Sequence, residues 1–421
     1  MSLEIITIIV LLFMFIIGSF ISVNMGVLGF VAAFVVGSLI SGLSIDEIYS
    51  VFPVGMFILL AGVSFLFAVA QNNGTLDLII SWGLKLVKGN VGLLPWVLFG
   101  ICALLTTVGV STVAVAPILY PIGLQLAYKY KINPILVGIL ISTGIYAGSF
   151  SPINLYGLIV QGIMGKEGIV YSPISFFINC LIYYVAISIV VFILFGGIKL
   201  LKVKSNVQTK NSSNENEEIE NKLTPYRAVT ILGILLLVVM GLVLEIDMGF
   251  GAFSIGLILS LIAPKKSANA LKQIPWTVII MVTGIVTYVG VMEMVGTMDM
   301  LNEFIASVGN SYLASLAASY IGGFVSAFAS TAGFIAAVVP LAAPILQDPN
   351  ISTVGVISTI AIGASVVDIS PFSTNGALIM ANAKVENEGK FFKNLLYIAG
   401  AFIVFGPGLA WLLFAVIGMP W

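Results

Sequence analysis

Apolar runs long enough to cross a membrane follow one another along almost the whole of this chain. A helix needs about 17 to 25 residues to span a hydrocarbon core of roughly 30 Å. The sequence predicts spans at 5–22, 26–43, 53–71, 134–163, 174–198, 226–244, 249–263, 275–292, 353–382 and 394–417. We therefore expect an all-α polytopic membrane protein.

The composition excludes most other classes of protein. Hydrophobic residues make up 60% of the chain and charged residues only 8%, whereas a soluble domain has about 25% charged residues. The net charge of -1 argues against nucleic-acid binding, which requires a basic face. The chain contains no histidine, and this removes His-based triads, haem ligation and most zinc or copper sites.

The groups that enzymatic or thiol chemistry requires are also missing. Cys102 and Cys180 lie in separate apolar segments without a CxxC spacing, so we interpret them as buried small hydrophobes. Asp368 is the single carboxylate predicted near the midplane, and no Ser/Lys pair lies at that depth. Acid–base or nucleophilic catalysis would therefore lack a partner group, and we expect no enzymatic activity and no cofactor.

The polar interruptions of the apolar runs occur twice, in the same order. TTVGVSTVAVAPILYPI, from Thr106, is echoed by ASTAGFIAAVVPLAAPI, from Ala329. SFSPINLYGLIV, from Ser149, is echoed by DISPFSTNGALIM, from Asp368. Two such pairs indicate an internal repeat, and interrupted apolar runs at matching positions are typical of the binding site of a secondary transporter.

The repeat divides the chain into two halves joined by a polar segment. We predict a first repeat at 1–202, a linker at 203–225 and a second repeat at 226–421. In each half a long stretch, 91–128 or 311–347, has a Ser/Thr/Gly cluster in its middle with prolines after it. Irregular backbone at membrane depth needs protein or a water-filled cavity to satisfy it. These stretches are therefore predicted to be re-entrant helical hairpins, with two full spans as the alternative.

The basic residues indicate which way each half is inserted. With a cytoplasmic linker, sixteen of the 17 Lys and Arg residues lie on the cytoplasmic side, as the positive-inside rule requires, and only Lys166 lies outside. Each half then has five spans, the fourth of them a broken helix, plus a hairpin. Five is an odd number of crossings, so the first half ends on the opposite side of the membrane from where it begins. The second half therefore begins on that opposite side, and the second repeat is inverted relative to the first. We expect the first hairpin to open from the cytoplasm of a bacterial plasma membrane and the second from outside.

The broken spans 134–163 and 353–382 carry the polar residues suited to binding. A proline frees backbone carbonyls that a cation can use, and the half-helix that restarts after the break presents unpaired N–H groups to an anion. Hydroxyls and amides complete either kind of site. The alternative is structural, because Ser/Pro pairs also kink membrane helices and small residues let helices pack closely.

The N-terminal region resembles a known family of carriers. VNMGVLGFVAAFVVGSLISGLSIDEIYSVFP, from Val23, and LLAGVSFLFAVAQNNGTLD, from Leu59, look like the N-terminal domain of the malonate/dicarboxylate carrier family. The paired hairpins and broken helices are similar to those of the ion-transporter superfamily that includes divalent anion/sodium symporters. This resemblance implies a homodimer that moves a dicarboxylate by an elevator-like displacement of its hairpin-bearing domain.

The same resemblance implies where the ligands bind. In those symporters a hairpin tip and a broken helix in each half bind sodium, and the two tips together hold the dicarboxylate. The implied substrate-binding residues are Thr106, Thr107, Ser111, Thr112, Asn154, Ser330, Thr331, Thr374 and Asn375. The implied Na⁺ ligands are Thr107, Ser149, Ser151, Asn154, Ser330, Asp368, Ser370, Ser373 and Asn375.

The chain departs from the symporter pattern in three ways. The hairpin Asn is replaced by Thr107 or Val108 in the first tip and by Thr331 in the second. Asp368 stands where the first half has Ser149, as a cation ligand, a proton carrier or a structural group. No Lys or Arg is expected near the midplane, so an anion would rely on helix N-termini, hydroxyls and a bound cation.

Three readings of the function follow. We expect a transporter of small carboxylates, such as dicarboxylates, coupled to Na⁺ or H⁺. An exporter of an oxyanion or another organic anion in the same superfamily is the main alternative. A channel would instead need a continuous pore and uncoupled flux.

Overall fold

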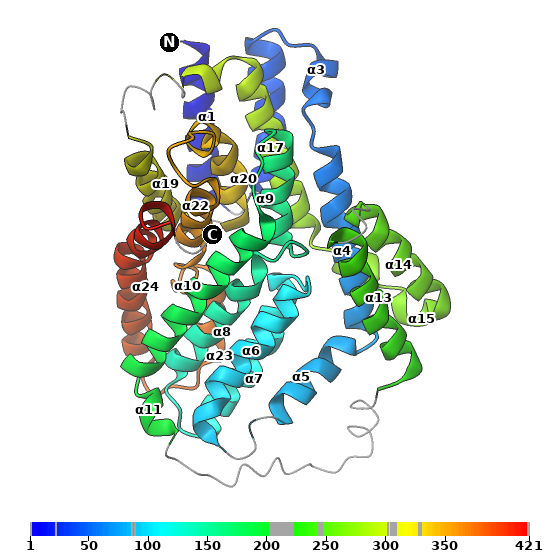
Figure 1. Ribbon diagram of the computed structural model, residues 1–421, viewed down its shortest axis with the longest axis vertical. Helices are drawn as coiled ribbons and strands as arrows, with labels where there is room; N and C mark the ends of the chain where they lie inside the picture. The colour runs from blue at the N-terminus through cyan, green and yellow to red at the C-terminus, as the bar shows by residue number, and fades with distance from the viewer. Residues whose placement is uncertain are drawn as a thin grey trace.

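The computed structural model describes residues 2–21, 23–85, 87, 90–201, 223–242, 247–300, 303, 310–326 and 331–418. Throughout these ranges the regular structure is helical (Figure 1). Four helices are long and apolar enough to cross a membrane: Val54–Asn72, Pro173–Leu194, Trp276–Met294 and Glu388–Val416. Shorter apolar helices accompany them. The prediction of an all-α chain with several helices of membrane length is therefore confirmed for the described residues.

The helices before the polar segment follow the predicted runs closely. They are α1 Leu3–Phe20, α2 Met25–Ala32 with its π-helical extension Ala33–Ile40, α3 Ile45–Ser50, α4 Val54–Asn72, α5 Thr75–Lys85, α6 Leu94–Thr107, α7 Thr112–Lys129, α8 Pro134–Ser149, α9 Leu155–Lys166, α10 Pro173–Leu194 and α11 Gly197–Leu200. The run predicted at 134–163 is thus two helices, α8 and α9, separated by a break.

The second part of the chain has the same order of long elements. Its helices are α13 Pro225–Leu242, α14 Met248–Ile262, α15 Pro264–Ser267, α16 Ala270–Gln273, α17 Trp276–Met294, α19 Ser311–Ser326, α20 Thr331–Leu341, α21 Ala343–Leu346, α22 Thr353–Ser365, α23 Thr374–Asn382 and α24 Glu388–Ala410, which continues as the π-helical Trp411–Val416. Most of the predicted linker lies outside the described residues. The limits and the inverted insertion of the two repeats stay predictions.

One set of helices packs through glycines that allow very close approach. A Cβ on Gly26 of α2 would lie 1.9 Å from the Ile280 carbonyl oxygen of α17, and one on Gly284 would lie 2.0 Å from the Gly26 carbonyl oxygen. Likewise, a Cβ on Gly62 of α4 would lie 2.3 Å from the carbonyl oxygen of Gly249 in α14. Small residues are the usual means by which membrane helices pack backbone to backbone. We call α1, α2, α4, α13, α14 and α17 the α4–α17 group.

The remaining long helices form a second set, the α8–α22 group, consisting of α6 to α10 and α19 to α24. In this set α6, α7 and α10 pack on α8, whereas α19 and α24 pack on α22, and α10 joins the two by contacting α22. Figure 1 shows α4, α13 and α14 on the right and the α8–α22 group on the left and in the centre. The two groups meet where α20 contacts α17 and where α9 contacts α4.

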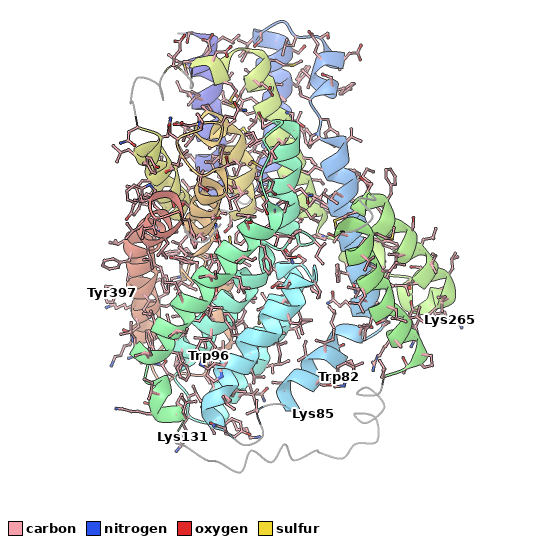
Figure 2. The ribbon with its side chains drawn as sticks, viewed as in Figure 1. Trp82, Lys85, Trp96, Lys131, Lys265 and Tyr397 are labelled. Atoms are coloured by element: carbon pink, nitrogen blue, oxygen red, sulfur yellow. The ribbon has the colours of Figure 1, made fainter. Side chains whose placement is uncertain are left out.

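Basic side chains mark one end of the molecule. Lys85 and Lys131 both lie at the lower end of the view in Figure 2, below the labelled Trp82 and Trp96. Both lysines come from segments that the charge pattern assigns to the cytoplasm. The structure contains no membrane, so the side on which this end lies remains a prediction.

Candidate functional site

Two breaks in helices and one tight turn meet in the middle of the α8–α22 group. The first break, 150–154, separates α8 from α9, and the second, 366–373, separates α22 from α23. The turn at 108–111 joins α6 to α7. Its predicted counterpart in the second half includes 327–330, which lie outside the described residues, and with them the predicted site residue Ser330.

The two breaks have the same local geometry because they have the same small residues. In the first break, the backbone N–H of Asn154 donates to the Ser151 carbonyl at 3.0 Å. In the second, the backbone N–H of Ser373 donates to the Ser370 carbonyl at 2.8 Å. The glycine that follows sits against that carbonyl in both cases. A Cβ on Gly157 would lie 2.0 Å from the Ser151 oxygen, and one on Gly376 would lie 1.8 Å from the Ser370 oxygen. Only a residue without a side chain fits either position.

Asn154 ties the first break to the α6–α7 turn. Its Nδ2 donates to the carbonyl oxygens of Thr106 at 2.7 Å and Val110 at 2.9 Å, and Ser151 Oγ donates to the Thr107 carbonyl at 2.7 Å. Gly109 allows this turn with a φ of 105°. Asn154 Oδ1 is buried and has no hydrogen-bond partner among the described residues. A buried acceptor without a donor, beside several carbonyl oxygens, is the arrangement that a cation can satisfy.

Asp368 occupies the second break and is bound by residues from both halves of the chain. Its Oδ2 accepts hydrogen bonds from the hydroxyl of Tyr146 on α8 and, at 3.0 Å, from Asn375 Nδ2 on α23. The corresponding residue of the first break, Ser149, instead donates to the Ile145 carbonyl of its own helix at 2.6 Å. The breaks therefore share a backbone path but differ in charge.

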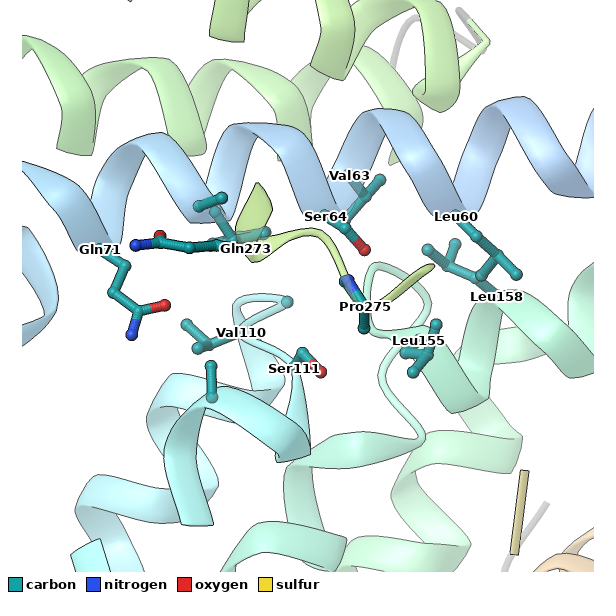
Figure 3. Close-up of a pocket in the computed structure, with 14 residues that line it drawn as sticks. Leu60, Val63, Ser64, Gln71, Val110, Ser111, Leu155, Leu158, Gln273 and Pro275 are labelled. Carbon is teal, nitrogen blue, oxygen red and sulfur yellow. The ribbon is translucent and has the colours of Figure 1, made fainter. Parts of the chain in front are cut away.

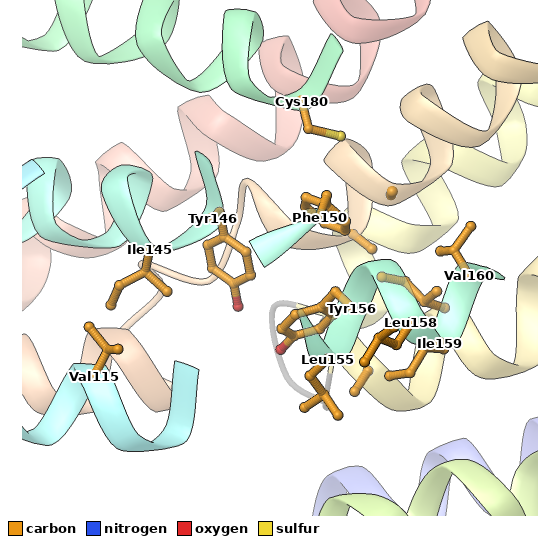
Figure 4. Close-up of a cluster of buried hydrophobic side chains, with 14 of the residues drawn as sticks. Val115, Ile145, Tyr146, Phe150, Leu155, Tyr156, Leu158, Ile159, Val160 and Cys180 are labelled. Carbon is orange, nitrogen blue, oxygen red and sulfur yellow. The ribbon is translucent and has the colours of Figure 1, made fainter. Parts of the chain in front are cut away.

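A cavity of about 510 Å³ lies in front of Asp368. Its polar lining residues are Thr112, Tyr146, Tyr156, Thr331, Asp368, Thr374 and Asn375. Figure 4 shows the hydroxyls of Tyr146 and Tyr156 directed into the same space beside α7, which carries Val115. The rest of the lining is apolar and includes Val278 of α17, and no Lys or Arg among the described residues lines the cavity. A volume of this size falls in the range of about 300 to 1,000 Å³ typical of ligand pockets.

Four helix N-termini face this cavity. The lining includes the first residue of α7, Thr112, and the first two residues of three further helices: Leu155 and Tyr156 of α9, Thr331 and Ala332 of α20, and Thr374 and Asn375 of α23. The first turn of a helix has N–H groups without partners in the helix and a partial positive charge. These ends together give a cavity without basic side chains a positive potential suited to an anion.

The predicted site residues separate into three sets. Thr112, Thr331, Asp368, Thr374 and Asn375 line the cavity. Thr106, Thr107, Ser149, Ser151 and Asn154 lie behind it in the first break and its turn, and Ser370 and Ser373 form the turn of the second break. Ser111 lines a separate pocket of about 30 Å³, which residues of α4 such as Ser64 and Gln71 also line (Figure 3). The ligand-binding roles of all these residues stay predictions.

Two lining residues, Tyr146 and Tyr156, were not predicted. Tyr156 had a detectable signal, because in the echo of SPINLYG by SPFSTNG it occupies the position of Asn375. Tyr146 had none, because it lies inside an apolar helix and reaches Asp368 only through the packing of the two halves.

Comparisons with known proteins agree on the class of molecule. Residues 1–149 match the family model described as the dicarboxylate carrier protein MatC N-terminus. Among solved structures, the fold is similar to that of the YdaH transporter of Alcanivorax borkumensis, whose crystal structure is described as having an unusual topology. The sequences are 12% identical, the TM-score is 0.61, and the match covers 87% of this chain and 86% of that one. No curated protein matches the sequence.

At this identity the likeness to YdaH shows the fold alone, while the family match is limited to residues 1–149. Both comparisons concern transporters, and they confirm the expectation that the chain is not an enzyme. The chain is a multi-pass membrane protein with a transporter fold, and its residues 1–149 are similar to the N-terminal part of the dicarboxylate carrier protein MatC.

Proposed function

We propose that this protein is a secondary transporter of small dicarboxylates, coupled to Na⁺, with its substrate site in the cavity in front of Asp368. The observation that carries the proposal is the meeting of four helix N-termini, from α7, α9, α20 and α23, at one cavity. Each such terminus stabilises an anion by about 0.3 to 1 kcal/mol when exposed and up to about 2 kcal/mol when partly buried. Their sum replaces the basic side chains that the cavity lacks.

The dicarboxylate assignment rests on the family match and on the spatial arrangement of these termini. The name of the matched family supplies the substrate class. Two of the four helices, α7 and α9, come from the first half of the chain and two, α20 and α23, from the second. A ligand with two carboxylates could engage one pair of termini with each.

Sodium coupling is supported by the oxygen cluster behind the cavity. Asn154 Oδ1 lacks a donor among the described residues, and the carbonyls of Thr106, Thr107 and Val110 lie around the same side chains. In this first set Thr107, Ser149, Ser151 and Asn154 would hold the ion. The second set would comprise Ser330, Asp368, Ser370, Ser373 and Asn375. A bound cation would add the positive charge that favours a carboxylate nearby.

The movement that we propose is an elevator-like displacement of the α8–α22 group against the α4–α17 group in a homodimer. All lining residues of the cavity come from the α8–α22 group except Val278 of α17. A substrate bound there would therefore be held almost entirely by one group of helices. That group could carry it past the other without dismantling the site.

Counterflow in proteoliposomes tests the proposed function. Liposomes preloaded with malonate, malate or succinate should take up the same labelled acid, and a sodium gradient should accelerate uptake. Liposomes preloaded with phosphate or sulfate should exchange little. Exchange of phosphate or sulfate without exchange of any dicarboxylate would favour the alternative, an oxyanion exporter. Flux that neither saturates nor depends on an ion gradient would indicate a channel.

A further inference from the structure

Among the described residues, Asp368 is the one carboxylate that lines the cavity, and no Lys or Arg lines it. Asp368 is buried, with 8% of its surface exposed, and it lines the cavity. The groups that donate to it are neutral: they include the Tyr146 hydroxyl and Asn375 Nδ2, and the Ser373 side chain and the Asn375 backbone N–H also lie against it. An uncompensated charge at such a site is costly unless a partner of opposite charge binds there.

The described residues around Asp368 supply aromatic hydroxyls and no basic side chain. Tyr146 of α8 donates to it, and Tyr156 of α9 lines the same cavity. On α24, by contrast, the charged side chains are exposed at its N-terminal end; they are Glu388, Lys390 and Lys393. A cation that pairs with Asp368 in this cavity would therefore be supplied by a ligand, because no Lys or Arg among the described residues lines it.

The site thus presents two opposite electrostatic features within one cavity. The helix N-termini favour carboxylates, and Asp368 favours a cation. Asn375 joins the two, because it is the second residue of α23 and its side chain donates to Asp368 at 3.0 Å. A ligand with an ammonium group and a carboxylate on neighbouring atoms would meet both features at this point.

We propose that Asp368 binds an ammonium group of the substrate, so that the site selects amino-substituted dicarboxylates over unsubstituted ones. This inference rests on the proposed transport of dicarboxylates and specifies their class. The ammonium donates to the Asp368 carboxylate, beside the hydroxyls of Tyr146 and Tyr156, which line the same cavity. The carboxylates of the substrate bind at the N-termini of α7, α9, α20 and α23.

The absence of this charge in the first half supports the assignment. Ser149 occupies the position of Asp368 in the other break and uses its hydroxyl within its own helix. The first break therefore follows the same backbone path as the second without a carboxylate at this position. Asp368 is an addition to that shared geometry, and its carboxylate faces the cavity.

The test compares two ligands that differ only in the ammonium group, aspartate and succinate. Binding to the purified full-length protein is measured by calorimetry at constant sodium concentration and neutral pH. A charged hydrogen bond of this kind corresponds to a preference of about 10- to 100-fold. We expect the unmodified protein to bind aspartate more tightly than succinate by that factor. Asp368→Asn should lose the preference, so that aspartate and succinate bind with similar affinity.

Two further variants keep the test informative. Asp368→Ser reproduces the residue found in the first break and serves if the Asn variant does not fold. Asp46→Asn removes an exposed carboxylate from the first turn of α3 and should leave the preference unchanged. Folding of each variant is checked by gel filtration and thermal unfolding.

The outcomes separate the two proposals. Equal or tighter binding of succinate by the unmodified protein, or an aspartate-to-succinate ratio that survives Asp368→Asn and Asp368→Ser, overturns the ammonium site. A ratio that survives the Asp368 variants is expected if Asp368 binds only sodium, because loss of the ion would weaken the binding of aspartate and of succinate by the same factor. Failure to bind or exchange either ligand or any other dicarboxylate would instead contradict the proposed function itself.

Discussion

Tyr146 of α8 donates a hydrogen bond to Asp368, a residue 222 positions later that occupies the break between α22 and α23. The bond joins the broken helix of the first half to that of the second, at the wall of the cavity. Tyr146 is also packed between two other tyrosine rings, with centroid distances of 5.8 Å to Tyr156 and 5.9 Å to Tyr184. Its hydroxyl is therefore held in place on the Asp368 carboxylate.

Replacing Tyr146 by phenylalanine should lower both transport and stability. The change removes one of the two side-chain donors to Asp368, and a buried group that loses its partner costs about 1 to 3 kcal/mol. Uptake in proteoliposomes and thermal unfolding measure the two effects. Tyr183→Phe is the matched control, because Tyr183 is equally buried and donates to the Gly406 carbonyl at 2.9 Å away from the cavity lining. Equal uptake by the two variants would contradict a role for the Tyr146 bond at the site.

Asn154→Ala should weaken the binding of the sodium ion that drives transport. The change removes both bonds to the Thr106 and Val110 carbonyls together with the unpartnered Oδ1. We expect the sodium concentration for half-maximal uptake to rise more than about tenfold, which corresponds to about 1.4 kcal/mol. The measurement is initial uptake over a series of sodium concentrations in proteoliposomes.

Asn179→Ala provides the control for that experiment. Asn179 is also buried, donates one hydrogen bond from Nδ2, to Ser358 Oγ at 3.0 Å, and has an Oδ1 without a partner among the described residues. It lies between α10 and α22, outside the first break. A loss of stability with normal sodium dependence is expected, and a shift as large as that of Asn154→Ala would show that the first effect is not specific.

Much of the helical framework could be predicted from the sequence because the bilayer leaves few alternatives. The run at 53–71 became α4 and that at 275–292 became α17 with shifts of one or two residues. The breaks were marked by Ser-Pro pairs that interrupt apolar runs, at Pro152 and Pro371. These patterns lie within short stretches of sequence, so they can be recognised without knowledge of the tertiary packing.

The parts that could not be predicted depend on contacts between distant segments. Tyr146 lies in the apolar helix α8, and nothing in its periodicity distinguishes it from a residue packed in the core. Its role follows only from the position of Asp368. The short helix α3 was also missed, although Ser44 and Glu47 form a capping box at its start, because its six residues are too few for a periodic pattern. Ser111 was grouped with the substrate residues by its place in the turn, but it lines a different pocket.

Alanine at Gly157 or Gly376 should disrupt the breaks themselves. Either Cβ would lie within 2.0 Å of a carbonyl oxygen, of Ser151 or of Ser370, so the backbone must shift. Overpacking of this kind costs about 1 to 3 kcal/mol or more. We expect a lower unfolding temperature and loss of uptake in both variants. Gly165→Ala, in the same helix as Gly157, has no atom within 4 Å of the added Cβ and should behave as the unmodified protein. Normal uptake by Gly157→Ala would show that the break is not held at this contact.

Labelling of single cysteines should locate the two ends of the molecule. Lys166, at the end of α9, is the only basic residue that the charge pattern places outside, whereas Lys265 is placed in the cytoplasm. Lys166 Nζ lies 3.8 Å from Glu293 Oε2. Because both side chains are partly exposed, loss of this ion pair should change the free energy of unfolding by less than about 1 kcal/mol. Cys102 and Cys180 are buried and should not react. In right-side-out vesicles, a membrane-impermeant maleimide should therefore label Lys166→Cys and spare Lys265→Cys. Labelling of Lys265→Cys alone would show that the whole chain is inserted in the opposite orientation. Labelling of both variants would contradict the inverted arrangement of the two repeats.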